Sequence, residues 1–351
     1  MQSRIVAALA MAAMGLAAVG CGERSSSSSS GAAGGATAQT SAALSAAAPN
    51  TTPAGDSSRK ANPHGRIPVL EYHLIGDQES MWMVEREHFK RQLQLLYDRG
   101  YRPVTMKQML DKDFSEVPPG MSPIVFVFDD ASPEQFSYIE RNGRLEIDPK
   151  SVVGIWTDFQ RRHPDWKSRA VFCTLNGAGD GHNFFGDKGI QGQKTEWRHQ
   201  KVKWLADQGH EICNHTLWHA QLSKYDDAFV QEQIARGQMG IDSAVPGYKV
   251  RTFALPQGLW PRNRPLAWKG SWTDRKSKRT VNYEYDAVLQ VAGGPSRSPY
   301  DAKFNPRSVT RVIVHGNELE KMLDQLDRAT DSTRARFVVG RAAPRGGTAA
   351  R

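Results

Sequence analysis

The stretch Ile-Val-Phe-Val-Phe-Asp-Asp at residues 124–130 decides the expected fold of this chain. Its first five residues are all apolar, which is typical of a strand buried on both faces, as in a parallel sheet. Two adjacent carboxylates, Asp129 and Asp130, follow where this strand must leave the core. Functional side chains of parallel α/β folds lie at the carboxyl ends of their strands. The stretch therefore predicts a parallel sheet with both carboxylates at its functional edge.

Strand-like and helix-like segments alternate on both sides of this stretch. Strands are expected at residues 67–72, 124–128, 170–175, 211–213, 252–255, 287–291 and 309–314. Helices are expected at residues 87–98 and 319–326, and two more are expected to start at Asp148 and Thr195 as N-caps. This alternation predicts an α/β fold whose parallel sheet is either closed as a barrel or doubly wound.

A second polar motif, Asn-His-Thr-Leu-Trp-His at residues 214–219, follows the strand expected at 211–213. Its two imidazoles, His215 and His219, are four residues apart, which predicts that they share one face of a helical turn. A carboxylate with two imidazoles is a good ligand set for a catalytic divalent metal ion that keeps open coordination positions. A second carboxylate could then act as a base on metal-bound water, so the two motifs predict metal-assisted hydrolysis.

The first twenty residues have the features of an export signal. Arg4 is followed by an apolar run at 5–19 that is too short to span a membrane. Small residues then lead into Cys21, which resembles a bacterial lipoprotein signal that is cleaved before a lipidated cysteine. An ordinary secretory signal is the alternative. In both cases we expect an extracytoplasmic protein, and in the first case one held to a bacterial membrane by its lipid.

The composition sets the limits of the folded domain. Residues 21–62 are rich in Ser, Ala, Gly and Thr and predict a flexible linker, because they offer little to bury. Residues 330–351 are rich in Arg, Gly and Ala and predict a disordered tail. The catalytic domain is therefore expected at residues 63–329, a length close to that of one α/β barrel.

The net charge and the cysteines each allow more than one interpretation. The net charge of +9 could favour anionic cell-wall polymers or simply solubility. Basic residues crowd between 262 and 279 without regularly spaced aromatic residues, so we expect no nucleic-acid partner. Cys173 and Cys213 could pair in an oxidising compartment if their strands are neighbours, or could be two buried thiols. The sequence leaves both possibilities open.

Taken together, these motifs resemble the NodB-homology polysaccharide deacetylases, carbohydrate esterase family 4. The family motif Thr-Phe-Asp-Asp-Gly stands here as Val-Phe-Asp-Asp-Ala at 127–131, and Ser/Asn-His-Thr-x2-His is matched at 214–219. A third motif, Phe-Ala-Leu-Pro-Gln-Gly at 253–258, follows another expected strand. The resemblance extends from residue 67 to about residue 314 and implies a distorted (β/α) barrel of about seven parallel strands.

The resemblance also implies a role for each matching residue. Asp129 would be the general base on metal-bound water. Asp130, His215 and His219 would hold a divalent metal ion, with Zn²⁺ as the expected ion. The ion would lower the pKa of its water and stabilise the developing oxyanion.

The third motif departs from the family pattern Arg-x-Pro-Tyr-Gly. Ala254 stands at the position of the Arg that orients the catalytic Asp, and Arg251 is a candidate replacement on the same strand. Gln257 stands at the position of the Tyr whose backbone N–H contributes to the oxyanion hole. Because a backbone N–H does not depend on the side chain, Gln257 can still donate it, with Pro256 beside it.

Three further residues carry weaker signals. His315 could be the general acid of the family's Leu-x-His motif, although the residues before it resemble a branch without that histidine. Trp260, and Trp218 between the two imidazoles, could line a sugar-binding groove, with ordinary apolar packing as the alternative. His73 could lie at the barrel mouth or be a structural histidine.

The sequence thus predicts a metal-dependent hydrolase that removes N-acetyl or O-acetyl groups from a cell-wall or extracellular polysaccharide. A non-catalytic carbohydrate-binding protein that keeps the scaffold is the alternative, and Ala254 is the feature that favours it. Hydrolysis of a non-carbohydrate amide at the same site is a third possibility.

Overall fold

The structure is a computed structural model that describes residues 59–177 and 183–341. The predicted signal peptide, Cys21 and most of the predicted linker lie outside these residues. No helix within the described ranges has both the length and the apolar composition needed to cross a bilayer.

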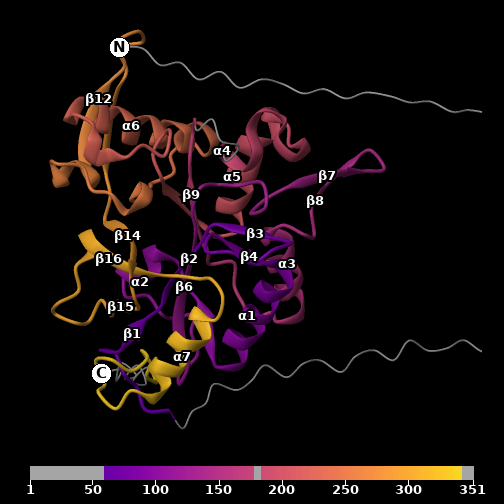
Figure 1. Cartoon of the computed structure of the whole chain (residues 1–351), viewed down its shortest axis with the longest axis vertical. Coiled ribbons are helices and arrows are strands. Elements are labelled where there is room, and N and C mark those ends of the chain that lie inside the picture. The colour runs from indigo at the N-terminus through magenta and orange to yellow at the C-terminus, as the bar shows by residue number, and fades with distance from the viewer. Residues whose placement is uncertain (1–58, 178–182, 342–351) are drawn as a thin grey trace, which may run out of the picture. The chain divides into compact units, whose positions relative to one another are not determined.

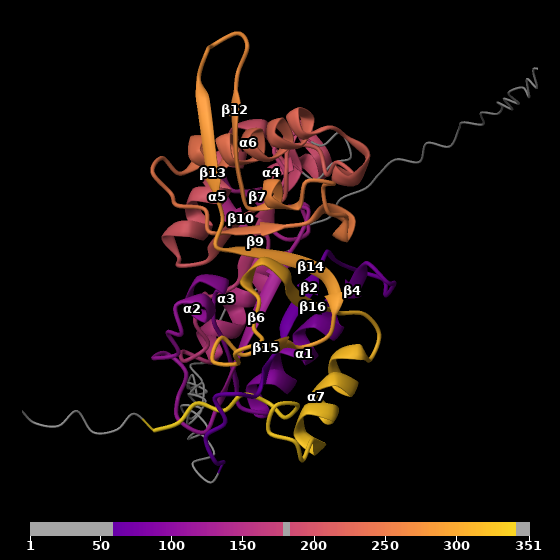
Figure 2. The same cartoon turned by 90° about the vertical axis from the view of Figure 1, so that its left-hand side faces the viewer.

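Seven parallel strands form a closed barrel at the centre of the domain (Figures 1 and 2). They pair in the order β2-β16-β14-β11-β10-β9-β6, and β6 pairs back with β2 to close the ring. The strands are β2 (Val69–Tyr72), β6 (Ser122–Phe128), β9 (Val171–Thr174), β10 (Glu211–Asn214), β11 (Thr252–Ala254), β14 (Ala287–Gly293) and β16 (Val309–Ile313), and β5 (Tyr101–Pro103) adds to β6. The predicted (β/α) barrel is confirmed.

The helices lie on the outside of the barrel (Figures 1 and 2). They are α1 (Arg86–Asp98), α2 (Met106–Leu110), α3 (Val152–Arg162), α4 (Asn183–Gly186), α5 (Arg198–Asp207), α6 (Asp227–Ala244) and α7 (Glu318–Arg328). α1 ends where predicted, because Gly100 follows its last turn with a φ of +76°, a conformation that glycine adopts without strain.

Two helix starts differ from the prediction. Ser151, and not Asp148, caps α3, because its hydroxyl accepts a backbone N–H of the first turn. α5 begins at Arg198 after a 3-10 turn that contains Thr195, so Thr195 is not its N-cap. In both places a tight turn separates the predicted cap from the helix, and cap preferences alone do not show the length of such a turn.

Strand alternation divides the core into two clusters. On β6, Phe126 and Phe128 pack outward in the cluster beneath the helices, whereas Val125 and Val127 belong to an inner cluster that also contains Cys173 and Cys213. Because side chains alternate along a strand, the residue after Phe128 returns to the inner side. Asp129 therefore points into the mouth of the barrel.

A disulfide joins two neighbouring strands in the inner cluster. Cys173 on β9 lies directly opposite Cys213 on β10, and the two form a disulfide with a Cα–Cα distance of 4.1 Å. The bond closes a sequence separation of 40 residues and removes chain entropy from the unfolded state. The structure thereby decides a question that the sequence left open, and it fixes β10 just before the His motif.

The folded domain extends further at both ends than predicted. Phe337 and Val338 are buried, and the Phe337 ring lies 4.9 Å from the ring of Phe114. Asn62 pairs with Val338 through backbone hydrogen bonds. The predictions of a tail from residue 330 and of a linker up to residue 62 are therefore wrong for residues 330–341 and 59–62. The reason is that the short apolar segment at Phe337 and Val338, within the Arg-rich tail, is buried against the domain.

Four small two-stranded sheets decorate the barrel. They are β1 (Arg66–Ile67) with β15 (Ser296–Arg297), β3 (Leu74–Gly76) with β4 (Met83–Glu85), β7 (Tyr138–Arg141) with β8 (Arg144–Ile147), and β12 (Lys269–Thr273) with β13 (Thr280–Glu284). The β12–β13 hairpin follows the third motif and projects beside α6 (Figure 2). It is anchored there by a hydrogen bond of 3.1 Å from Ser271 N to Gln231 Oε1.

Candidate active site

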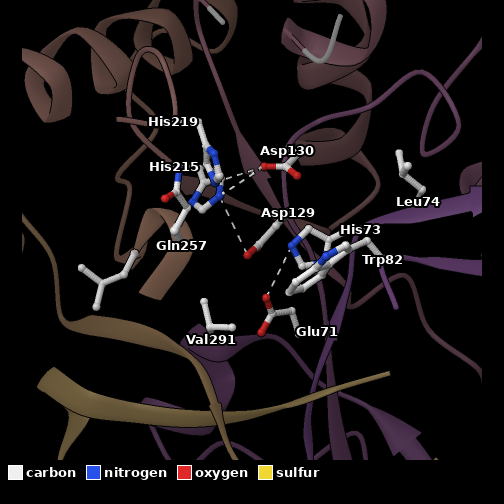
Figure 3. Close-up of a pocket in the computed structure, with 11 residues that line it drawn as sticks. Glu71, His73, Leu74, Trp82, Asp129, Asp130, His215, His219, Gln257 and Val291 are labelled. Carbon is white, nitrogen blue, oxygen red and sulfur yellow. Dashed lines mark ion pairs between the residues drawn. The ribbon is translucent and has the colours of Figure 1, made fainter. Parts of the chain in front are cut away.

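A cavity of about 430 Å³ opens at the carboxyl ends of the barrel strands. It is lined by Glu71, His73, Leu74, Trp82, Asp129, Asp130, His215, His219, Leu255, Gln257 and Val291 (Figure 3). The cavity thus brings together the two motifs that the sequence singled out and adds two residues from the first barrel strand and its end.

The two aspartates diverge because the chain turns sharply after β6. Asp129 is 1% exposed, and its N–H donates to the carbonyl of Tyr72 at 3.0 Å. Asp130 and Ala131 both adopt left-handed conformations, with φ values of +73° and +51°. Ala131 therefore keeps the backbone geometry that the glycine of the family motif would adopt without strain. The turn directs Asp129 into the barrel mouth and Asp130 towards the imidazoles.

The His motif is an irregular loop and not a helical turn, so that prediction is wrong. Thr216 and His219 have positive φ values of +74° and +57°, which no helix accommodates. The loop is held against α6: Leu217 N donates to Gln233 O at 2.9 Å. Gly237 permits this close approach, because a Cβ there would lie 2.9 Å from the backbone of Thr216.

Three donor atoms converge at one side of the cavity. The Nε2 atoms of His215 and His219 lie 3.4 and 3.6 Å from Oδ1 of Asp130, and all three atoms lie within 4.8 Å of one another. Nδ1 of His215 is 2.9 Å from the carbonyl of Ala254, which can only accept a hydrogen bond, so Nδ1 carries the proton. In its neutral form His215 therefore presents the lone pair of Nε2 to the cavity, as a metal ligand must.

Two of the converging atoms lack hydrogen-bond partners within the described part of the chain. Oδ1 of Asp130 and Nε2 of His215 are buried and have no hydrogen-bond partner among the residues that the structure describes. Buried polar atoms of this kind call for a partner, and a cation satisfies both. The three residues therefore fit a divalent metal ion.

The protonation states also suit a metal ion. Burial opposes the charge of Asp130, but the neighbouring imidazoles of His215, His73 and His219 together hold the pKa of this carboxyl well below its usual range. Burial and the neighbouring His215 lower the pKa of His219 to about 4. Near neutral pH Asp130 is thus a carboxylate and His219 a neutral imidazole, the forms that bind metal ions. Although burial opposes its charge, Asp129 and Asp130 raise the pKa of His215, so a bound cation would displace the proton from its Nε2.

Arg311, and not Arg251, holds Asp129. Arg251 lies at the start of β11 and pairs with Asp111 and Asp286, so its predicted role is wrong. Arg311 on β16 is fully buried, and its guanidinium lies 3.0 and 2.9 Å from the two carboxylate oxygens of Asp129. Although burial opposes ionisation, Arg311 keeps the pKa of Asp129 below its usual value. In the sequence, Arg311 could have been recognised as a single charged residue within an otherwise uncharged strand.

Glu71 on β2 is a second residue that the sequence analysis missed. Its side chain is buried, with Oε2 lying 3.3 Å from Nε of Arg311 and Oε1 lying 3.5 Å from Nε2 of His73. Burial raises the pKa of Glu71 to about 8. One guanidinium thus faces two carboxyl groups, and Asp129 is the one that stays ionised near neutral pH. A lone Glu within Val-Leu-Glu-Tyr was the available signal.

Of the remaining predicted site residues, some lie at the cavity and others lie outside its lining. Gln257 lines the cavity with a φ of +55°, and Pro256 is buried beside it. His315 follows β16, and its carbonyl accepts a hydrogen bond from Glu318 at the start of α7, but His315 is not among the residues lining the cavity. Trp260 is also outside the lining and packs partly buried under the guanidinium of Arg264.

Comparison with known proteins identifies part of this domain directly. The polysaccharide deacetylase family model matches residues 168–269. A chitooligosaccharide deacetylase from Sinorhizobium fredii is 35% identical over 71 residues, which is 20% of this chain and 33% of that protein. A second chitooligosaccharide deacetylase, from a Bradyrhizobium strain, is 31% identical over 62 residues, 18% of this chain and 28% of that protein. The matches thus span about a third of the length of these curated relatives.

Solved structures extend the similarity to the whole barrel. The deacetylase PplD from Streptococcus pyogenes, solved in complex with acetate, superposes with a TM-score of 0.51 at 15% identity, covering 74% of this chain and 98% of that chain. A polysaccharide deacetylase from Bacillus cereus gives a TM-score of 0.51 at 17% identity, covering 74% and 69%. At these identities the likeness concerns the fold. The sequence match at residues 168–269 is therefore to the polysaccharide deacetylase family, and the barrel as a whole shares the fold of the solved polysaccharide deacetylases.

Proposed function

We propose that this protein is a metal-dependent hydrolase that removes N-acetyl or O-acetyl groups from a cell-wall or extracellular polysaccharide. The observation that carries the proposal is the convergence of Asp130, His215 and His219 beside a buried, Arg-held Asp129. The family match at residues 168–269 and the deacetylase activity named for the matching proteins support an acetylated glycan as substrate.

We assign the ion as Zn²⁺, because one carboxylate and two imidazoles leave open positions in a zinc-type ligand set. When bound, such an ion would polarise the acetyl carbonyl and make a water molecule more acidic. Asp130, His215 and His219 would hold it. Gln257, at the same side of the cavity as the imidazoles, would offer its backbone N–H to the developing oxyanion (Figure 3).

Two side chains would handle protons. Asp129, kept ionised by Arg311, would take a proton from the attacking water. His73 lies on the other side of Asp129 from His215 and would give a proton to the leaving amine (Figure 3). His73 is a better candidate for this acid than His315, because it lines the cavity.

A non-catalytic carbohydrate-binding protein is less well supported. The absence of an Arg at Ala254 was the feature that favoured it. In the structure, Arg311 approaches Asp129 from another strand, and the carbonyl of Ala254 orients His215 instead. A binding protein needs neither a held base nor a set of metal ligands.

Removal of the metal tests the proposal. The purified protein is expected to contain about one zinc ion per chain, and a chelator is expected to abolish acetate release from acetylated glucosamine oligomers. Added Zn²⁺ should restore the rate. Elemental analysis and an acetate assay measure both quantities, with circular dichroism as the control for folding. Full activity in metal-free protein would refute the proposal.

We further propose that the protein works outside the cytoplasm on a lipid anchor at Cys21. The buried Cys173–Cys213 disulfide supports an oxidising compartment. Cys21→Ser is expected to move the protein from the membrane fraction to the soluble fraction, which immunoblotting of the two fractions would show. A variant that stays in the membrane fraction would contradict the anchor.

A further inference from the structure

Exposed aromatic side chains lie next to the His motif that supplies two of the proposed metal ligands. Trp218 stands between His215 and His219 in the chain, and it is 48% exposed. Its ring centroid lies 6.1 Å from that of Phe229. Phe229 in turn lies 4.2 Å from the ring of Tyr225, which is 42% exposed. Ordinary core packing does not account for aromatic rings with this exposure next to a catalytic cavity.

A groove lies beside these aromatic side chains. The groove has a volume of about 820 Å³ and lies between the start of α6 and the β12–β13 hairpin. Phe229 and Arg236 line the groove, and both also contact Trp218, with the Arg236 guanidinium 5.9 Å from the Trp218 ring. Trp272 of the hairpin lines the groove as well. Trp218 therefore links the His motif to the groove through its contacts with Phe229 and Arg236.

The charges of the groove argue against a strongly charged ligand. Its lining holds three acidic and three basic side chains, which are Asp226, Glu232, Asp274, Arg236, Arg275 and Lys276. Equal numbers of both signs give no net attraction for a polyanion. Aromatic faces interleaved with carboxylate, amide and guanidinium groups suit a chain of sugar rings, which have apolar faces and hydroxyl or acetamido edges.

We propose that this groove, here called the α6–hairpin groove, binds further sugar units of an uncharged chain of β-linked acetamido sugars. The proposal rests on the proposed function, since the acetyl group of the same chain would lie in the metal cavity. Trp218 would bridge the two sites. The substrate would accordingly be a polymer, and the enzyme should act faster on long chains than on short ones.

Chain length provides the test. Initial rates of acetate release are measured on β-1,4-linked N-acetylglucosamine oligomers of two and six units, and kcat/KM is compared. The wild-type protein is expected to prefer the longer oligomer. Trp272→Ala is expected to reduce the ratio of the two kcat/KM values by about tenfold, equivalent to about 1.4 kcal/mol. Arg236→Met, which leaves the hairpin intact, should reduce the ratio in the same direction.

Tyr300→Ala is the matched control. Tyr300 is also an exposed aromatic residue, but it stacks on Phe337 and does not line the groove. Its replacement should leave the ratio unchanged. If Trp272→Ala and Arg236→Met leave the ratio unchanged, or if Tyr300→Ala lowers it as much, the groove is not a subsite.

A binding measurement separates this inference from the proposed function. Calorimetry with Asp129→Asn and the six-unit oligomer requires no turnover, and adding Trp272→Ala should weaken binding about tenfold. If wild-type protein releases no acetate but binding depends on Trp272, the groove stands and the hydrolase proposal fails. If the oligomer does not bind, or binds equally well without Trp272, the groove proposal is overturned.

Discussion

Asp129→Asn is expected to lower kcat for acetate release by roughly 100- to 10,000-fold, the range attributed to a general base. Asn has nearly the same shape as Asp but cannot take a proton from water. Asp129 is not one of the three converging donors: its Oδ2 lies 4.0 Å from Nε2 of His215, and its carboxylate groups instead with Glu71 and His73. The variant should therefore keep the zinc ion that we propose for this site. Parallel measurements of kcat and of bound metal check both statements.

Asp130→Asn is the matched control for Asp129→Asn. The two residues are neighbours in sequence, but Asp130 supplies one of the three converging atoms. Its replacement should reduce bound zinc and activity together. If Asp129→Asn loses metal in proportion to its activity, Asp129 acts as a ligand and not as the base.

Arg311→Met is expected to destabilise the protein by about 3–5 kcal/mol, the usual cost of removing one partner of a buried ion pair. Arg311 faces both Asp129 and Glu71 inside the barrel mouth, and without it two buried carboxyl groups lose their only neighbouring guanidinium among the residues described. Urea denaturation of the metal-free proteins measures the change. The activity of the variant should fall as well, because Asp129 loses its orienting partner.

Arg251→Met provides the comparison for Arg311→Met. Arg251 also pairs with two carboxylates, but these are exposed at the other end of the barrel strands. Exposed pairs contribute about 1 kcal/mol or less. Equal destabilisation by the two substitutions would contradict the special position of Arg311.

The loss of folding stability caused by Arg311→Met should depend on pH. Arg311 lowers the pKa of Asp129 in the folded protein, and a lowered folded pKa contributes stability above the unfolded pKa that is lost as the pH falls. The difference in unfolding free energy between wild type and variant should thus shrink as the pH falls below about 4, and it should be larger near pH 6 than near pH 3. An unchanged difference at both pH values would show that packing, and not charge, is lost.

Much of the fold follows from local patterns. The apolar run at 124–128 and its alternation with helical segments predict a parallel barrel, because burial on both faces requires such strands. The same pattern places Asp129 and Asp130 at the carboxyl end of the barrel strands, where the cavity opens. The motif at 214–219 predicts the imidazoles of the site, but not their loop conformation, since four-residue spacing is compatible with more than one backbone path.

The sequence by itself predicted the family resemblance, the barrel and the side chains that converge on the proposed metal site, because each depends on periodicity within one segment or on residues at a strand end. Only the tertiary structure decided which charge holds Asp129. Barrel closure places the first strand, β2, between β6 and the last strand, β16, so that Glu71 and Arg311 meet Asp129. Alternation shows which side a residue faces, but it does not show which strands become neighbours.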